Sequence, residues 1–399
     1  MQYDCCIIGA GILGLATAFK LMQIKPGLRI LILEKELSVA AHQTGHNSGV
    51  VHSGVYYRPD SLKARLCREG CVETQRFCAR YDIPIATIGK LIVATSVLEL
   101  ERLSALENRA AANAIAVDRL DRLGLAELEP NIVGLGALRV KSTGITDYVA
   151  ICRTLLSVLI EQGAEIRFGA AVADIAERDD MVVIAMANQD SAEASMLIVC
   201  AGLQSDRLAR LAGLASDTRI VPFKGEYYRL PASRSTLVNH LIYPVPDPQL
   251  PFLGVHLTRH IDGTTTVGPN AVLTLAREGY APHSFVAADA YDTLRFTGFW
   301  RLAAANMASG VREMGMSLSK RQYLTAVQKY CPALTLNDLE TYSSGIRAQA
   351  VSAKGQLIED FSFVRSARTL HVLNAPSPAA TSALPIGRMI ADASGLIEA

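Results

Sequence analysis

The chain has 399 residues and half of them are apolar, which is long enough for two domains and ample for a large buried core. With 39 basic and 38 acidic residues its formal net charge is +1, which excludes both the basic footprint of a nucleic-acid-binding protein and a polybasic segment for anionic lipid. Eight cysteines are scattered without a CxxC pair or zinc-ligand spacing, so we expect buried free thiols, a reducing compartment and no metal.

No stretch approaches the roughly 20 uninterrupted apolar residues of a membrane-spanning helix. The chain enters an apolar strand at its third residue, so we expect no signal peptide. These features predict a cytoplasmic protein. They leave open a peripheral attachment to the inner membrane.

Residues 3–34 have the pattern of a nucleotide-binding βαβ unit. An apolar strand at 3–8 leads into the glycine-rich turn 9–14, a helix at 12–22 and a second strand at 28–33. The glycines allow a tight turn, close approach to a pyrophosphate and helix–sheet packing, while an acid after the second strand suits a ribose hydroxyl and disfavours a 2′-phosphate. We therefore expect a dinucleotide other than NADP, bound by Gly9, Gly11, Ile12, Gly14, Glu34 and Lys35.

A polar loop at 40–57 follows, with three histidines, three glycines and two adjacent tyrosines. Small residues let the backbone approach a flat ligand, and the remaining side chains can then touch it. This composition favours a loop wrapped over a flavin. The alternative is a polar surface loop.

In the middle of the chain, helices are expected at 61–81, 99–113 and 148–162 and a strand at 89–95. Strands are then expected at 164–168, 171–175 (with Val172), 181–186 and 196–200, and these strands would rejoin the nucleotide-binding sheet. The last of these strands ends on Ala201 and Gly202 before a helix at 205–213, a turn that suits a backbone pressed against a cofactor.

Beyond residue 219 the pattern becomes β-rich. Strands are expected at 223–230, 240–244, 252–259 and 264–267, forming an antiparallel floor over a flavin, and helices at 289–309 and 320–329. Phe296, Phe299 and Trp300 on the first of these helices are expected to pack in a core rather than touch a membrane.

The end of the chain returns to the first domain. Strands at 357–364 and 370–373 precede a loop of small residues at 374–383 and a helix at 384–393, a plausible cradle for a flavin carbonyl. We therefore expect an α/β fold. A discontinuous Rossmann-like FAD-binding domain would span 1–82, 143–215 and 341–399, and a mainly antiparallel β-sheet with helices, at 83–142 and 216–340, would bind substrate.

With these motifs in hand, the sequence resembles the FAD-dependent D-amino-acid oxidase superfamily, and within it the members that oxidise L-2-hydroxyglutarate. The runs that carry the resemblance are spread over nearly the whole chain: 42–49 (HQTGHNSG), 52–57 (HSGVYY), 129–138 (EPNIVGLGAL), 225–228 (GEYY), 239–248 (NHLIYPVPDP), 251–259 (PFLGVHLTR), 327–332 (VQKYCP), 347–352 (RAQAVS) and 374–387 (NAPSPAATSALPIG). The resemblance implies oxidation of L-2-hydroxyglutarate to 2-oxoglutarate on FAD.

The resemblance also implies roles for individual residues. Beside the dinucleotide fingerprint, the family's cofactor contacts fall on Thr44, His46, Asn47, Ser48, Gly202, Pro378, Ala379, Ala380 and Thr381. Arg347 matches the arginine that grips a substrate α-carboxylate, and His52 and Tyr56 match pocket positions. Some relatives attach FAD covalently through a cysteine near the C-terminus, which has no counterpart here because no cysteine follows Cys331. Other relatives attach FAD through a histidine, and His46 lies near that position. We expect noncovalent FAD.

A site for a 2-hydroxydiacid needs a cation for the α-carboxylate, a base for the hydroxyl proton and a second polar group for the distal carboxylate. Arg347 can bind the α-carboxylate in a bidentate manner, and a histidine can take the hydroxyl proton as hydride leaves Cα. His52 and His256 are the candidate bases, with His52 slightly preferred. The candidates for the distal carboxylate are Lys224, Arg259, Tyr56 and Tyr243. The electron acceptor is O2, giving H2O2, or a membrane quinone.

Two rival functions share these features. An oxidase of an amino or N-methyl acid would use the same fold and the same arginine. A flavin-binding protein without catalysis could serve as a redox-sensing module. A nicotinamide-dependent dehydrogenase is a third possibility, which would carry no bound yellow cofactor.

Overall fold

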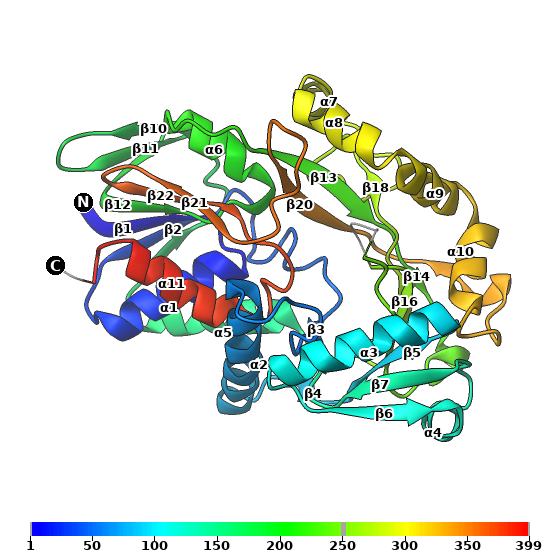
Figure 1. Cartoon of the computed structure of the whole chain (residues 1–399). Helices are drawn as coiled ribbons and strands as arrows, with labels where there is room; N and C mark the ends of the chain where they lie inside the picture. Colours follow the sequence, from blue (N-terminus) through cyan, green and yellow to red (C-terminus); the bar gives the residue numbers. More distant parts are fainter. Residues whose placement is uncertain (1, 249–252, 398–399) are drawn as a thin grey trace.

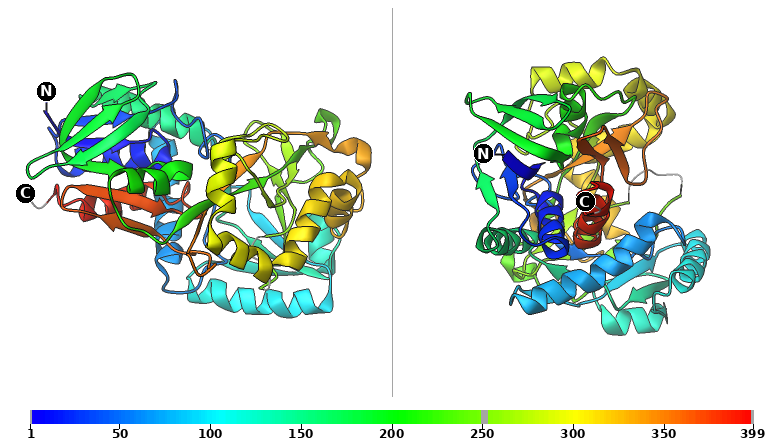
Figure 2. Two further views of the ribbon diagram at one scale, coloured as in Figure 1. Left: turned by 90° about the horizontal axis from the view of Figure 1, so that it is seen from above. Right: turned by 90° about the vertical axis from the view of Figure 1, so that its left-hand side faces the viewer.

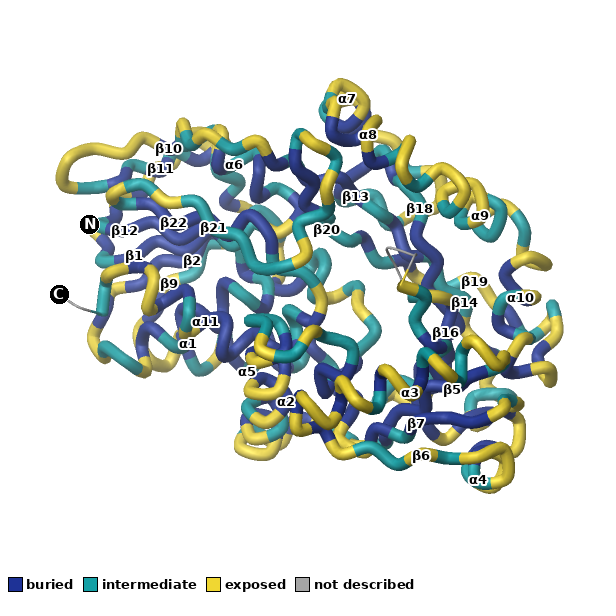
Figure 3. Tube along the Cα trace, viewed as in Figure 1, coloured by how far each residue is buried: buried dark blue, intermediate teal, exposed yellow. Residues whose placement is uncertain are grey.

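The computed structural model describes residues 2–248 and 253–397. Its first sheet is built around β1 (Gln2–Ile8), which pairs in parallel with β2 (Ile30–Leu33) on one side and β12 (Ser191–Val199) on the other. β9 (Glu165–Arg167) and β22 (Thr369–Asn374) extend this parallel core outward. Antiparallel β10 (Val172–Glu177), β11 (Val182–Met186) and β21 (Ser362–Arg365) complete the sheet, whose central strands are buried (Figure 3).

The two faces of this sheet are covered differently because successive side chains of β1 point to opposite sides. Cys5 and Ile7 face α1 (Ile12–Ile24), α5 (Tyr148–Glu161) and α11 (Ala383–Ala393), which pack together in one apolar cluster. Cys6 and Ile8 face the β10–β11 hairpin and α6 (Ser205–Leu211). The first and last helices of the chain therefore lie side by side on one face (Figure 1).

A second sheet forms the other half of the molecule (Figure 2). Its strand order is β19 (Glu340–Thr341), β14 (Tyr228–Arg229), β17 (Thr265–Gly268), β16 (His256–Arg259), β15 (Leu241–Pro244), β5 (Lys90–Ala94), β7 (Gly136–Val140) and β6 (Val117–Asp121). All neighbours are antiparallel except β15 and β5. It is flanked by α3 (Val97–Ala112), α4 (Arg122–Leu128) and α10 (Lys320–Gln328).

Two small sheets connect the halves. β13 (Arg219–Gly225) pairs along its length with β20 (Gly345–Val351), with β18 (Val272–Leu273) at its edge. β8 (Gly144–Thr146) joins β3 (Val50–Val51) to β4 (Ile85–Ala86), and α2 (Leu62–Arg80) follows the loop after β3. Predicted first-domain residues 345–351 thus pair with residues 219–225 from the range predicted for the other domain.

Most of the expected elements are present, but three expected strands differ from those observed. The strand at 223–230 is interrupted, so β13 and β14 belong to different sheets; a Cβ at Gly225 would lie 2.9 Å from Pro269 Cβ, which indicates how tightly the chain turns there. The strand expected at 357–364 is reduced to a bridge at Leu357 and to β21. Of the strand expected at 252–259, residue 252 lies outside the described residues and β16 covers 256–259.

The single helix expected at 289–309 is three helices, α7 (Ala287–Leu294), α8 (Thr297–Ala305) and α9 (Met307–Leu318). Asn306 separates the last two, and its side-chain amide donates to the Leu302 carbonyl at 2.9 Å, competing with the helical hydrogen bonds. Phe299 is buried as expected, whereas Trp300 is 56% exposed. None of the helices in the described ranges is both long and apolar enough to cross a membrane.

All eight cysteines are free, and seven of them are buried. Burial raises the pKa of the Cys6, Cys67, Cys200 and Cys331 thiols to about 12. They pack as small apolar side chains, which agrees with the expectation of free thiols.

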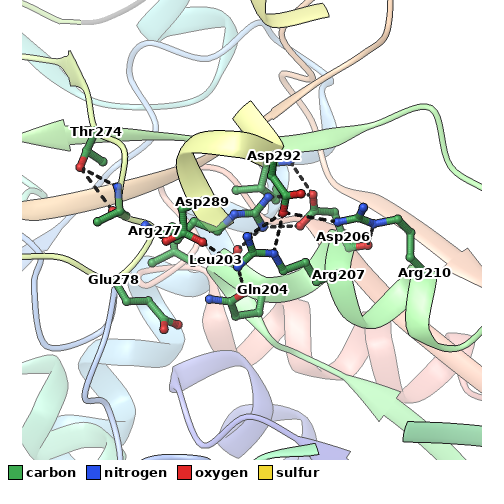
Figure 4. A network of polar contacts seen from close by, with 12 residues as sticks. Leu203, Gln204, Asp206, Arg207, Arg210, Thr274, Arg277, Glu278, Asp289 and Asp292 are labelled. Atoms are coloured by element: carbon green, nitrogen blue, oxygen red, sulfur yellow. Dashed lines mark hydrogen bonds and ion pairs between the residues drawn. The ribbon is translucent and has the colours of Figure 1, made fainter. Parts of the chain in front are cut away.

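A buried ionic network ties the first sheet to the segment before α7 (Figure 4). Arg277, 1% exposed, forms a two-pronged ion pair with Asp206 of α6 and donates to the Leu203 carbonyl at 2.8 Å. Arg207 binds Asp289 at 2.7 Å and Asp292 at 2.6 Å. Because Asp206 also accepts from the Ile220 amide, one carboxylate holds α6, β13 and residue 277 together.

Asp206→Ala should lower the free energy of unfolding by about 3–5 kcal/mol, because it leaves the Arg277 guanidinium buried without its partner. Glu340→Ala, which removes the partner of Arg229 in a pair whose side chains are 45% and 44% exposed, is the matched control. It should cost less than about 1 kcal/mol. Denaturant titration measures both, and equal losses would contradict the importance assigned to the buried pair.

Candidate active site

The glycine-rich turn after β1 has the shape expected of a phosphate cradle. Gly9 has φ +103°, and a Cβ there would lie 2.5 Å from the Cys200 carbonyl oxygen. A Cβ at Gly14 would lie 1.9 Å from the Gly9 carbonyl oxygen, so helix and turn are in contact. Gly11 differs, because its Cβ would meet only the Thr44 hydroxyl at 3.4 Å. The space beside Gly11 is therefore open to a ligand, at the point where strands on either side of β1 diverge.

Glu34 directly follows β2 and is buried beside this turn. Its carboxylate accepts from the Ala10 amide at 2.8 Å and from the Glu36 amide at 2.9 Å. Those bonds orient it toward the turn and leave acceptor capacity for a ribose hydroxyl. Val172 lies just after residues 169 and 170, whose amides donate to the Glu36 and Glu34 carbonyls, so it borders the same corner.

Lys35 lies next to Glu34 in a small ionic group. Its ammonium pairs with Glu36 and with Glu278 at 3.1 Å and lies 2.7 Å from His42 Nε2. Glu36, His42 and Glu278 have a metal-like arrangement, but the cation among them is the lysine itself.

The first part of the polar loop, residues 40–48, folds over the glycine turn. The Thr44 hydroxyl accepts from the Ile12 amide, the first of α1, at 3.1 Å. His46 stacks on Tyr280 with ring centroids 3.6 Å apart, and its Nδ1 lies 3.1 Å from the Ser344 carbonyl oxygen. Asn47 caps the turn by accepting from the Gly49 amide, while Ser48 follows it in the same loop. The loop is thus positioned between the nucleotide corner and β20.

Two further turns border this region. Gly202, φ +49°, begins the turn after β12, next to Ala201, and a Cβ there would lie 2.6 Å from Gln43 of the polar loop. The loop at 378–381, which contains Pro378, Ala379 and Ala380, ends on Thr381, whose hydroxyl accepts from the His52 amide at 3.0 Å. Thr381 also bonds Tyr148 and the Val50 carbonyl, which fixes the start of the 52–57 segment.

Beyond that segment lies a group of basic and aromatic side chains, which we call the chamber: His52, Tyr56, Lys90, Tyr243, His256 and Arg347. Lys90, Tyr243 and His256 are buried, and the other three residues are half-buried. The Lys90 ammonium lies over the Tyr56 ring, 4.5 Å from its centroid, and 4.8 Å from that of Tyr243. Tyr243 in turn stacks on His256 at 4.0 Å. The charges of Arg347 and Lys90 both act on His256, which places it near both cations.

Both histidines of the chamber are held in the neutral form. Burial lowers the pKa of His256 to about 3, assisted by Arg347 and Lys90. Burial also lowers the pKa of His52 to about 3, assisted by Lys90 and His256. His256 Nδ1 lies 3.0 Å from the Gly254 carbonyl oxygen, so in the neutral ring this nitrogen carries the proton and Nε2 is the free base.

Two residues predicted for the distal carboxylate lie outside the chamber. Lys224 pairs in register with Ile346, so it is on the face of the β13–β20 ladder opposite Arg347, and it donates to the Ala281 carbonyl at 2.6 Å. Arg259 follows Thr258 on β16 and shares a face with Leu257, whose side chain is in the core behind the sheet. Tyr56 and Tyr243 are in the chamber.

Sequence reasoning missed Lys90 and Tyr227. Burial lowers the pKa of Arg347, and Tyr227 opposes that change. Lys90 opens the apolar strand KLIVA, all five residues of which are buried. A lysine at the end of an apolar strand usually reaches solvent, so only its neighbours in space distinguish it.

The glycine cradle, the acidic residue beside it and the adjoining polar loop together define a dinucleotide-binding flavoprotein fold. A family model described as FAD dependent oxidoreductase matches residues 4–393. The chain belongs to this family of FAD-dependent oxidoreductases, which confirms the resemblance, the fold class and the cofactor expected from the sequence.

Relatives of known name cover nearly the whole chain. An L-2-hydroxyglutarate dehydrogenase from Escherichia coli K12 is 50% identical over 98% of this chain and 92% of its own. The mitochondrial L-2-hydroxyglutarate dehydrogenase of Homo sapiens is 41% identical over 98% and 88%. Among solved structures, L-alpha-glycerophosphate oxidase from Mycoplasma pneumoniae, with FAD bound, superposes with a TM-score of 0.80 at 22% identity, covering 100% of this chain and 95% of that one. Glycine oxidase from Geobacillus kaustophilus gives 0.74 at 16%, with the same coverage.

Gly11→Ala tests the cradle without straining the fold, because the new methyl would meet only the Thr44 hydroxyl at 3.4 Å. The variant should fold with an unchanged melting temperature when FAD is removed. It should bind FAD at least about tenfold more weakly, a difference of about 1.4 kcal/mol. Gly310→Ala is the control for adding a methyl, because Gly310 lies in α9, has nothing within 4 Å of an added Cβ and has no positive φ; its FAD affinity should not change. Unaltered FAD binding in Gly11→Ala would contradict the assignment of this turn.

Proposed function

We propose that this protein oxidises L-2-hydroxyglutarate to 2-oxoglutarate. The observation that carries the substrate is the 50% identity, over 98% of the chain, to the Escherichia coli L-2-hydroxyglutarate dehydrogenase. The chamber supports the proposal, because two cations and two neutral histidines suit an anionic hydroxy acid.

Arg347 binds the substrate α-carboxylate in this proposal. Its planar guanidinium can donate two parallel hydrogen bonds to a carboxylate, which fixes both the position and the rotation of the neighbouring Cα. Burial lowers the pKa of Arg347 from its usual value, while Tyr227 and Glu313 oppose that change. A guanidinium remains protonated in proteins, so this end of the chamber is permanently positive.

A histidine takes the proton of the substrate hydroxyl as the C–H bond breaks. Bound FAD supplies the acceptor for the hydride that leaves Cα. His256 is supported as the base by its fixed tautomer, with Nε2 unprotonated and Nδ1 held by the Gly254 carbonyl. His52 is the alternative base, and its ring makes no hydrogen bond with any residue of the described ranges; the Thr381 contact holds its backbone. The product is a ketone, and the histidine leaves the step as an imidazolium.

His256→Gln should slow anaerobic flavin reduction by about 10²–10⁴-fold, the range for loss of a general base. His52→Gln is the paired variant, and a smaller loss there assigns the base to His256. The reverse order would transfer that role to His52. Stopped-flow absorbance at the flavin band measures both.

The kcat/KM of the wild type should show no acid limb near the usual histidine pKa. A base works only when it is unprotonated, and burial lowers the pKa of both histidines to about 3. The rate should therefore hold from neutrality down to about pH 5 and fall only below it. A half-maximal rate at about pH 6.5 would show that the base is a histidine with an unshifted pKa.

The substrate assignment is tested by mixing the yellow holoprotein anaerobically with L-2-hydroxyglutarate. Bleaching by this enantiomer, and by neither the D enantiomer nor glycine, N-methylglycine and proline, is the expected result. Bleaching by an amino or N-methyl acid would favour the oxidase alternative, and no bleaching would favour a non-catalytic flavin module. Repeating the assay in air with peroxide detection, and then with an added quinone, assigns the electron acceptor.

A further inference from the structure

Lys90 is a buried cation without a counter-ion. It is 1% exposed, at the start of a strand whose five residues are all buried. Within the described ranges, no carboxylate lies at ion-pair distance from its ammonium and no atom accepts a hydrogen bond from it. Removing an ammonium from water without a partner is costly, and partners are normally supplied by carboxylates or a ligand.

The surroundings of the ammonium compensate for this burial only in part. The faces of Tyr56 and Tyr243, at 4.5 and 4.8 Å, attract a cation by their ring quadrupoles. Burial nevertheless lowers the pKa of Lys90 to about 8, so it is still mainly charged at neutral pH. The titratable groups whose charges act with it are His52, His256, Cys67 and the two tyrosines, and none of them is an acid ionised at neutral pH.

Lys90 and Arg347 lie on different strands, β5 and β20. Both cations lower the pKa of His256, whereas Lys90 and not Arg347 acts on His52. The Tyr243 ring contacts both the Lys90 ammonium, 4.8 Å from its centroid, and the His256 ring, stacked at 4.0 Å. The chamber therefore holds a second cation close to the candidate base, as a hydroxy acid with two carboxylates needs.

Tyr56 adds a donor at the same end. Its hydroxyl is buried and has no hydrogen-bond partner among the described residues, although its ring lies under the Lys90 ammonium. A buried hydroxyl of this kind is normally bonded, so a ligand atom is the natural partner.

We propose that Lys90 binds the distal carboxylate of the substrate, with Tyr56 as a second donor, and that it selects dicarboxylates over monocarboxylates. This inference rests on the proposed function for the identity of the substrate, but its chemical content is the second anionic group. The two other cations considered for this role are placed elsewhere, since Lys224 donates to Ala281 and Arg259 shares the opposite sheet face with Leu257.

The test is equilibrium binding of two unreactive acids, glutarate and pentanoate, to the FAD-loaded protein, read from the flavin spectrum and by calorimetry. They have equal length and differ by one carboxylate. The wild type should bind glutarate at least about fiftyfold more tightly than pentanoate, as expected for a buried ion pair. Lys90→Met should lose most of that preference while binding pentanoate as well as or better than the wild type.

Lys141→Met is the matched control, because Lys141 is an exposed lysine paired with Asp118 at the surface. It should keep the full preference for glutarate.

The preference of the wild type should also fall as the pH rises through about 8, since Lys90 then loses its proton, and Lys90→Met should show no such change. FAD content and melting temperature report whether each variant is folded, and Lys90→Met should melt no lower than the wild type because it removes an unpaired buried charge.

The possible results are distinct. A glutarate preference retained in Lys90→Met would overturn the assignment of Lys90, and so would a wild type that does not distinguish the two acids. Neither outcome decides whether L-2-hydroxyglutarate is the substrate, because the bleaching assay tests that proposal separately. Loss of the preference in Lys90→Met with pentanoate binding intact supports Lys90 as the distal anchor.

Discussion

The antiparallel ladder between β13 and β20 is the constraint on which the arrangement of the site depends. Seven residue pairs, from Arg219 and Val351 to Gly225 and Gly345, hold together segments that are far apart in the chain. Because the register of a ladder decides which face each side chain occupies, it also decides that Arg347 and Lys224 point to opposite sides. A slip of one residue would exchange them and remove the guanidinium from the chamber.

The cofactor corner and the chamber are built from different kinds of interaction. The corner is made mainly of backbone, with Gly9, Gly14 and Gly202 in positions where a Cβ would collide with neighbouring atoms. The chamber combines side chains on strands, which position groups more firmly than loops do, with His52 and Tyr56 of the 52–57 segment. The 378–381 loop connects the two, because Thr381 holds the backbone at His52.

Sequence reasoning performed best where local rules decide the structure. The βαβ unit at 3–34 follows from strand pattern, glycine spacing and the terminal acid, all of which act within a few residues. It failed where distant packing decides, as at Gly225, where a strand that alternation alone would continue ends and the chain passes to another sheet, and at Asn306, where a side chain interrupts a helix. Lys90 was missed for the same reason, because its two aromatic neighbours come from the 52–57 segment and from β15. The resemblance supplied Arg347, which no local rule marks.

The buried cysteines have a consequence for the durability of such a catalyst. Peroxide attacks the thiolate and not the thiol. With the pKa of Cys6, Cys67, Cys200 and Cys331 raised to about 12, the ionised fraction at pH 7 is on the order of one in a hundred thousand. A flavoprotein that leaks electrons to oxygen generates peroxide, and thiols that stay un-ionised react with it slowly, so many cysteines can persist in its interior.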